Sequence, residues 1–324
     1  MKFKLSTFLP LLGVALFLAV LYFANPAAIF ATLAGANASL VLLAFAVNFS
    51  ALFFKSWRWQ RICRFIGFQV PFLDATRYWL ASFSFGAVTP GRIGDLSRAF
   101  YLKRPKNVPF SRSLITVFVD RLFDVFTLVL LGAFGIFSLA SSSIFGSQTV
   151  YNIALFLGAF VALLLLLTKK NAMLLVLRPV FSFFVPDAYK ERVRVNFNDF
   201  YELLPSLRKQ KLLLLTSLLL SVIPWFVSIY SYQVLAQALG LNLGIGYLLQ
   251  VIPIIFLLEL VPVSFSGLGT RDAALVVFFS FIGLTATQAV SFSIAMLSLH
   301  VLNVLLGALL FYREHPDVSV LWKK

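Results

Sequence analysis

Long runs of apolar residues, separated by short polar segments, dominate the sequence. Some 20 residues of α-helix cross a hydrocarbon core of about 30 Å, because the helix rises about 1.5 Å per residue. Runs near this length predict membrane spans at residues 8–24, 39–54, 114–140, 150–168, 212–236 and 289–311. We therefore expect an all-α, polytopic transmembrane helical bundle that forms one domain over residues 1–324.

Two further apolar runs are too short to span and adjoin breaks rich in Gly and Pro. About eleven apolar residues lie at 78–88, and about eleven more follow position 272, so each run is roughly half a span. A chain that enters the membrane halfway and turns back forms a re-entrant hairpin. The pattern predicts two such broken-helix hairpins, at about 74–104 and 247–283. Their turns would use Pro90, Gly91, Gly94, Pro262, Gly267 and Gly269.

The distribution of charge predicts the orientation. Four stretches hold most of the basic residues, at 55–77, 98–112, 169–211 and 313–324. Three segments between predicted spans carry no charge and are expected to be outside loops, at 25–37, 141–149 and 237–246. Because positively charged loops stay in the cytoplasm, we expect a multi-pass protein of the cell membrane with both termini cytoplasmic. The hairpins would then enter from opposite sides, which is the inverted-repeat arrangement of many transporters.

Composition restricts the partners of the chain. Hydrophobic residues make up 60% and charged residues 12%, which excludes an ordinary soluble domain. The net charge of +15 is carried by segments between spans without an RNA-binding signature, so we expect anionic lipid headgroups as partners and no nucleic acid. In the polar segment 169–211, four apolar residues recur at helical spacing, which predicts an amphipathic helix on the inner surface. These are Val193, Phe197, Phe200 and Leu204.

Nine ionisable residues fall within the predicted spans and hairpins: Arg92, Asp95, Arg98, Asp120, Arg121, Asp124, Glu259, Arg271 and Asp272. Each costs about 2.5 to 3.5 kcal/mol at the bilayer centre, so together they require mutual pairing, water or a ligand. Asp120 and Asp124 share a helix face, and Arg121 can pair with Asp124. Alternatively, Arg92 and Arg98 lie at the cytoplasmic surface. For Asp120, Arg121 and Asp124, the alternative is a structural ion pair that ties helices together.

Other chemistry is sparse in the sequence. Cys63 is the single cysteine, and the two histidines do not have the spacing of metal ligands, so we expect no metal and no cofactor. Asp120 and Asp124 are a conceivable Mg²⁺ pair, but the neighbouring Arg121 disfavours a cation. His300 is a hydrogen-bonded packing residue or, alternatively, a proton relay. No nucleophile triad, phosphate loop or dinucleotide motif is present, so the chain is not expected to be an enzyme.

Three motifs carry a resemblance to a known family. They are the segment 89–95 with Arg98, the Asp120-Arg121-Leu122 triplet with Asp124, and the segment 267–272. With these motifs the chain resembles the lysylphosphatidylglycerol synthase transmembrane-region family, a flippase-like domain also found in lipid-linked glycan and hopanoid pathways. The family usually has Glu where this chain has Asp95, Asp120 and Asp272. The synthases add a soluble aminoacyl-transferase domain, which we do not expect here, because thirteen residues follow Phe311.

The resemblance implies a membrane protein that moves a polar-headed lipid between leaflets. The arginines within the membrane favour a head that contains phosphate, because a guanidinium binds two phosphate oxygens at once, so we expect a lipid flippase or transporter. Three arginines would bind the anion: Arg92, Arg121 and Arg271. Five acids would orient these arginines or exchange protons: Asp95, Asp120, Asp124, Glu259 and Asp272. The alternatives are a membrane-embedded enzyme acting on lipid-linked phosphates or sugars, and a membrane partner for a separate synthase or glycan-pathway enzyme. The identity of the lipid and the oligomeric state stay open.

Overall fold

The computed structural model describes residues 9–87, 89–102, 110–141, 151, 155, 158, 209–259 and 267–314. These ranges contain helices and no strand, so the predicted all-helical class is confirmed for them. The helices are α1 (Leu9–Phe23), α2 (Pro26–Ala34), α3 (Ala38–Ile66), α4 (Phe72–Ala87), the 3-10 helix η2 (Pro90–Tyr101), α5 (Phe110–Ser141), α10 (Lys211–Ala238), α11 (Ile245–Glu259), α12 (Thr270–Ser280) and α13 (Ala286–Glu314). Four predicted features lie wholly or mostly outside the described residues: the amphipathic segment 169–211 up to residue 208, the loop 141–149 after residue 141, most of the span 150–168, and Pro262.

Four of the predicted spans are confirmed as helices long and apolar enough to cross a membrane. They are Ala38–Ile66, Arg112–Ala140, Lys211–Ala238 and Ala286–Tyr312. Each has at least 27 residues, or about 40 Å of helix, which exceeds a hydrocarbon core of about 30 Å. The four helices are therefore long enough to cross the apolar layer even when tilted.

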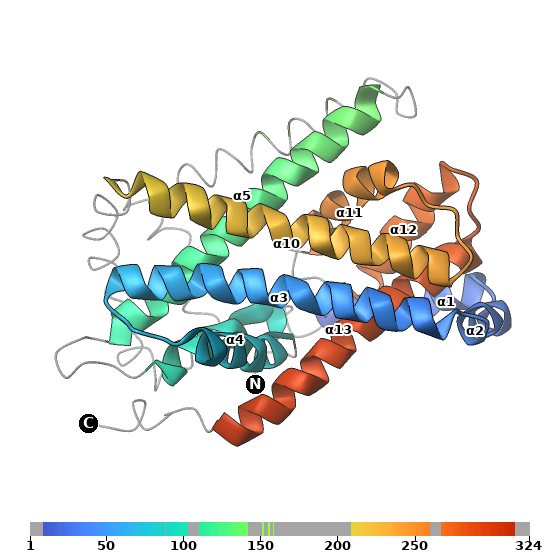
Figure 1. Ribbon diagram of the computed structural model, residues 1–324. Helices are drawn as coiled ribbons and strands as arrows, with labels where there is room; N and C mark the ends of the chain where they lie inside the picture. Colours follow the sequence, from blue (N-terminus) through green and yellow to red (C-terminus); the bar gives the residue numbers. More distant parts are fainter. Residues whose placement is uncertain are drawn as a thin grey trace, which may run out of the picture.

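The helices α3 and α10 form an antiparallel pair along the middle of the bundle (Figure 1). The amide of Asn37, just before α3, donates to the carbonyl of Ala238 at the end of α10, at 2.9 Å. Further along the pair, the Asn48 amide donates to Ser231 Oγ at 3.1 Å. The start of α3 and the end of α10 thus lie at the same end of the bundle.

The N-terminal region differs from the prediction. Residues 25–37 were expected to be an outside loop, but most of them form α2, which is bent by 84° from α1. Asn25 takes a positive φ of 60°, and its side chain accepts a hydrogen bond from the amide of Ala28. Pro26 follows at the first helical position, where its missing N–H leaves no hydrogen bond unmade. An Asn cap followed by Pro is a signal for the start of a helix. The loop was predicted because residues 25–37 carry no charge, and an uncharged segment can equally be a helix.

The first hairpin consists of α4 and η2, which pack against each other. At its tip, Thr89 Oγ1 accepts a hydrogen bond from the amide of Gly94 at 2.8 Å. A Cβ atom on Gly94 would overlap with the carbonyl of Phe85, so only glycine permits this approach of the two arms. At the open end the rings of Tyr78 and Tyr101 stack at 4.9 Å. The predicted hairpin therefore forms, with its entering arm starting earlier than expected, at Phe72.

The second hairpin consists of α11 and α12, which also lie close to the predicted positions. At its open end the Tyr247 hydroxyl donates to the carbonyl of Phe278. At its tip, Gly267 and Gly269 take positive φ values of 78° and 85°, which other residues rarely adopt. These two glycines therefore allow the chain to turn into α12.

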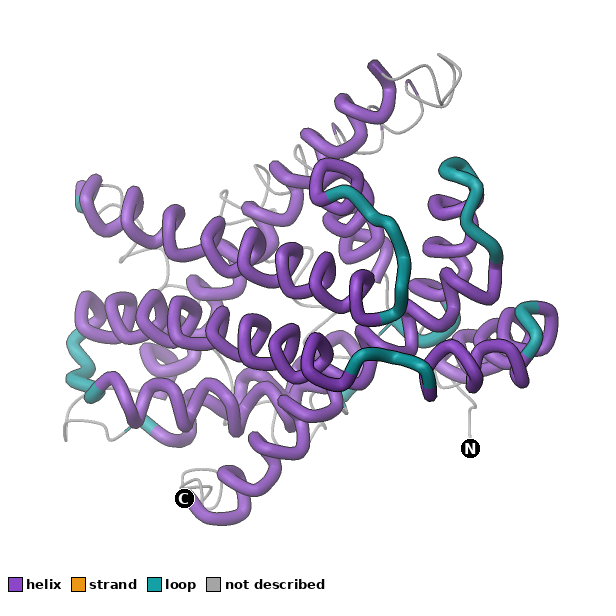
Figure 2. Tube along the Cα trace, turned by 45° about the vertical axis from the view of Figure 1, so that its right-hand side comes forward, coloured by secondary structure: helices purple, strands orange, loops and turns teal. Residues whose placement is uncertain are grey.

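The two hairpins open at opposite ends of the bundle. The first begins six residues after the end of α3, whereas the second begins seven residues after the end of α10. Figure 2 shows these two connections at opposite ends of the molecule. Inside the bundle, α4 packs on α13, and α11 packs on α5. Both contacts are close, because a Cβ on Gly307 of α13 or on Gly135 of α5 would overlap with the neighbouring backbone.

Candidate functional site

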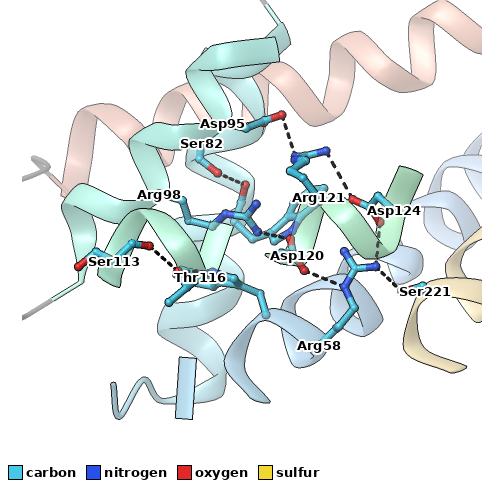
Figure 3. A network of polar contacts seen from close by, with 12 residues as sticks. Arg58, Ser82, Asp95, Arg98, Ser113, Thr116, Asp120, Arg121, Asp124 and Ser221 are labelled. Carbon is cyan, nitrogen blue, oxygen red and sulfur yellow. Dashed lines mark hydrogen bonds and ion pairs between the residues drawn. The ribbon is translucent and has the colours of Figure 1, made fainter. Parts of the chain in front are cut away.

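A continuous chain of ion pairs connects α3, η2 and α5 inside the bundle (Figure 3). Three arginines and three aspartates alternate along it, in the order Arg98, Asp120, Arg58, Asp124, Arg121 and Asp95. We call these six residues the Arg/Asp chain. Its formal charges cancel, which explains how so many ionised groups are accommodated among apolar helices.

Asp120 is the centre of the Arg/Asp chain. Its Oδ1 atom lies 2.7 Å from Arg58 Nε, and its Oδ2 atom lies 3.0 Å from Arg98 Nη1. The side chains of all three residues are fully buried. Asp120 lies eight residues, or about 12 Å of helix, from the start of the candidate membrane span Arg112–Ala140.

The other end of the Arg/Asp chain is partly open. Arg58 Nη1 lies 2.8 Å from Asp124 Oδ1, and Asp124 Oδ2 lies 3.5 Å from Arg121 Nη1. Arg121 Nη2 then reaches Asp95 Oδ2 at 2.8 Å, which joins α5 to the first hairpin. The side chain of Arg121 is 28% exposed and that of Asp124 is 17% exposed. Among the three arginines of the Arg/Asp chain, Arg121 thus has the most exposed side chain.

Arg58 was missed by sequence reasoning, which assigned it to a cytoplasmic basic stretch. In the structure it is fully buried, bridges two aspartates, and donates to Ser221 Oγ of α10 at 2.7 Å. A signal was present, because Arg58 falls on the same helical face as the buried residues Trp59 and Ile62. The exposed Arg64 lies outside that face.

Arg98 is buried, which contradicts the alternative that it lies at the cytoplasmic surface. Its guanidinium carbon lies 4.9 Å from the ring centroid of Trp59 and 5.5 Å from that of Trp79. Aromatic faces attract a desolvated cation, so these rings stabilise Arg98 together with Asp120. Arg98 and Asp95 both belong to η2, and their ion pairs hold the first hairpin against α5.

The second hairpin carries a separate group of charges. Arg271 Nε donates to Ser293 Oγ of α13 at 2.9 Å, and its Nη1 atom lies 4.0 Å from Glu259 Oε1. Asp272 Oδ2 accepts from the amide of Gly269 at 2.7 Å and so caps α12. The carboxylate of Glu259 lies against Gly267, where a Cβ would overlap with it.

The predicted site residues therefore fall into two groups among the described residues. Asp95, Arg98, Asp120, Arg121 and Asp124 come together in the first, and Glu259, Arg271 and Asp272 in the second. The side chains of Pro90 and Arg92 lie outside the described part of the chain, and so do the surroundings of Gly91.

A cavity of about 120 Å³ lies between α3, α4, α10, α11 and α13. On one side, the ring centroid of its lining residue Trp79 lies 5.5 Å from the Arg98 guanidinium of the Arg/Asp chain. On the other side, the lining residues Phe256 and Met296 lie about one helical turn from Glu259 and from Ser293, the hydrogen-bond partner of Arg271. The cavity thus lies close to both charged groups.

The carboxylates of the Arg/Asp chain are poor candidates for metal ligands. Each oxygen of Asp120 already faces an arginine, and Asp124 lies between Arg58 and Arg121. Among the described residues no cluster of three or more His, Cys, Asp or Glu has the spacing to hold a metal ion.

Comparison with known proteins gives relatives of similar length. A UPF0104 membrane protein of Methanothermobacter thermautotrophicus is 22% identical over 302 residues, covering 88% of each chain. A UPF0104 membrane protein of Methanocaldococcus jannaschii is 23% identical and covers 98% of each chain. The chain is also 24% identical to the protein named glycosyltransferase AglD of Haloferax volcanii, over 89% of this chain and 50% of that protein.

The family model described as the lysylphosphatidylglycerol synthase TM region matches residues 11–307, nearly the whole chain. This match covers both hairpins and all six residues of the Arg/Asp chain. The chain is therefore a multi-pass membrane protein that belongs to the lysylphosphatidylglycerol synthase transmembrane-region family.

Proposed function

We propose that this protein moves a lipid with a polar, phosphate-containing head between the leaflets of the cell membrane. The observation that carries the proposal is the Arg/Asp chain, which ties a re-entrant hairpin to two membrane-spanning helices through buried ion pairs. Ionisable side chains inside membrane spans are expensive, and they mark substrate or ion pathways in many transporters.

The pairing of helices supports two related halves. If α3, α4, η2 and α5 correspond to α10, α11, α12 and α13, then the contact of α4 with α13 corresponds to that of α11 with α5. The helices α3 and α10 run in opposite directions, as an inverted repeat requires. In transporters of this kind, one repeat rocks against the other around a central site. We extend that mechanism to this chain.

Arg121 is the residue through which a phosphate would act on the first hairpin. Its guanidinium is partly exposed and already holds two carboxylates, Asp95 of η2 and Asp124 of α5. A guanidinium binds two phosphate oxygens in the same planar geometry that it uses for a carboxylate. A lipid phosphate that competes with Asp95 would loosen the link between η2 and α5. Arg92 and Arg271 are the further anion-binding residues in the proposal.

The test is lipid movement in reconstituted vesicles with a fluorescent phosphatidylglycerol. Arg121→Gln is expected to slow the exchange between leaflets by about tenfold or more, the equivalent of one lost charged hydrogen bond. Arg77→Gln is the matched control, because the Arg77 side chain is 51% exposed and its ion pair with Asp74 lies within one helix, outside the Arg/Asp chain. If Arg121→Gln exchanges lipid at the rate of the parent, the proposed route is wrong.

A role as a membrane subunit in lipid-linked glycan synthesis is the second candidate. It is favoured by the likeness to half of the protein named glycosyltransferase AglD. In this case the chain would bind a separate enzyme and hold it at the membrane, and it would not transport lipid. Purification of the full chain from its own membranes, with one enzyme at equal stoichiometry and no lipid exchange in vesicles, would support this role over transport.

A further inference from the structure

The N-terminal helices α1 and α2 pack on the second hairpin, although they lie outside the two corresponding sets of helices. Helix α1 contacts α12 and α13, and α2 contacts α13 (Figure 1). From Gly13 to Phe23, α1 extends for about 15 Å, because an α-helix rises about 1.5 Å per residue. Helix α12 has 11 residues and therefore a similar length. Thus α1 is long enough to follow α12 from the turn of the hairpin to its open end.

Helix α1 meets the second hairpin at its turn. A Cβ on Gly269 would overlap with the carbonyl of Gly13, which is buried. Gly269 takes a positive φ of 85° and directly precedes α12, whose first turn carries Arg271 and Asp272. The backbone of α1 therefore lies against the turn that positions these two charged residues.

The bend between α1 and α2 is attached near the opposite end of α12. Thr287 Oγ1, in the first turn of α13, donates to the carbonyl of Ala24 at 2.7 Å. Beside this hydrogen bond, an apolar cluster joins α1, α2, α12 and α13. It includes Val20, Leu21, Ala24, Ile29, Val276 and Val290. The two N-terminal helices therefore hold α12 both at the turn and toward its open end.

The links that hold the two hairpins differ in their chemistry. Asp95 of the first hairpin pairs with Arg121 of α5, whose side chain is 28% exposed, and a phosphate is a competing partner for this guanidinium. By contrast, α1 and α2 hold the second hairpin through backbone contact and apolar packing. A charged headgroup offers no replacement for these contacts, and separating them would leave an unfavourable cavity.

We propose that α1 and α2 form a brace that keeps the second hairpin fixed on α13 while the first hairpin moves. In transporters with inverted repeats one half rocks against the other, and the brace determines which hairpin stays in place. The assignment of movement to the first hairpin rests on the proposed lipid transport. The attachment of the second hairpin by the brace does not depend on transport.

Amide hydrogen exchange tests the brace, because it measures how readily each segment opens. Ile29→Ala removes a side chain that is 3% exposed, and Phe30→Ala removes the neighbouring side chain, which is 75% exposed. In the purified full chain in a maltoside detergent, Ile29→Ala is expected to speed exchange in α12 by about tenfold or more, because it leaves a cavity in the brace. Phe30→Ala should leave exchange in α12 within about twofold of the parent. Equal rates in the two variants would overturn the proposal.

A second pair of variants leaves α2 unchanged and covers the case in which Ile29→Ala fails to fold. Gly269→Ala introduces a Cβ that overlaps with the carbonyl of Gly13. Gly283→Ala is the matched control, because its φ of 77° imposes a similar strain while a Cβ there meets open space. Gly269→Ala should speed exchange over residues 13–23 of α1 by about tenfold, and Gly283→Ala should not. Parent-like exchange of α1 in both variants would overturn the brace.

Added lipid tests which hairpin moves. Phosphatidylglycerol should speed exchange in η2 by about threefold or more, because its phosphate competes with Asp95 for Arg121. Diacylglycerol lacks the phosphate and should leave η2 unchanged. Exchange in α12 should be the same with both lipids. An equal increase in α12 and η2, or no response of η2, would overturn the assignment of movement.

The failures of the two proposals are distinguishable. If the parent exchanges no lipid in vesicles but Ile29→Ala still speeds hydrogen exchange in α12, transport is contradicted and the brace is kept. If the parent exchanges lipid and α12 responds to phosphatidylglycerol as η2 does, the brace is contradicted and transport is kept.

Discussion

At the scale of single residues, Asp120 determines how the charges of the bundle are compensated. Each of its oxygens faces a different arginine, one from α3 and one from η2, and all three side chains are fully buried. Burying charges is costly even when they are paired, but removing one partner is worse, because it leaves the other uncompensated. The residue therefore affects stability through two cations at once.

Asp120→Asn is expected to lower the free energy of unfolding by about 3 to 5 kcal/mol, because Arg58 and Arg98 lose their shared counter-charge. Thermal unfolding of the purified protein in detergent measures this. Asp74→Asn is the control, since Asp74 is 36% exposed and its pair with Arg77 contributes about 0 to 1 kcal/mol. Equal effects of the two substitutions would contradict the buried position of Asp120.

The pairing of Arg121 with Asp95 allows a second residue-scale prediction. Since Arg121 Nη2 lies 2.8 Å from Asp95 Oδ2, the double variant Arg121→Gln/Asp95→Asn should be more stable than the sum of the single effects implies. A double-mutant cycle of thermal stabilities is expected to give a coupling of about 0.5 to 3 kcal/mol. Strictly additive effects would show that the pair does not hold the first hairpin.

At the scale of elements, the tip of the first hairpin depends on two glycines. A Cβ on Gly94 would overlap with the carbonyl of Phe85, and a Cβ on Gly86 would overlap with the carboxylate of Asp95. The absence of side chains therefore lets η2 lie directly on α4, which carries Asp95 and Arg98 to their partners on α5. The turn and the ion pairs are parts of one arrangement.

Gly94→Ala is expected to displace η2 from α4 and to lower the free energy of unfolding by about 1 to 3 kcal/mol through overpacking. It should also slow lipid exchange in vesicles, because Asp95 would no longer meet Arg121. Gly244→Ala is the matched control, since a Cβ there meets open space. If Gly94→Ala is as stable as the parent, then η2 and α4 do not pack as closely at Gly94 as in the structure.

At the scale of the whole molecule, the two ends of the bundle differ in charge. The loop between α10 and α11 carries no charge, whereas the far end of α3 carries Arg61 and Arg64. Because positively charged loops stay in the cytoplasm, we propose that the first of these ends is outside and the second is cytoplasmic.

Cysteine labelling in intact cells tests this orientation with little background, because the native Cys63 is fully buried. Asn242→Cys, in the exposed loop after α10, should react with a membrane-impermeant maleimide without lysis. Arg64→Cys, at the exposed end of α3, should react only after lysis. The reverse result would invert the proposed topology.

Apolar run length and turn residues were sufficient to predict four spans and both hairpins. The spacing of Asp120, Arg121 and Asp124 was sufficient to group them on α5. Pairing across 62 residues, as between Arg58 and Asp120, leaves no periodic signal in the sequence. Arg58 was assigned to the surface because basic residues surround it, although α3 continues to Ile66. The separation of Glu259 and Arg271 from the Arg/Asp chain depends on how whole helices pack, which local patterns do not encode.

The stacked rings of Tyr78 and Tyr101 have a mechanical consequence for the first hairpin. They join the two arms at the end of η2, while the hydrogen bond between Thr89 and Gly94 joins them at the tip. Because α4 and η2 contact each other at both places, we expect the two arms to move together. A displacement of the tip would then also shift the tyrosine pair.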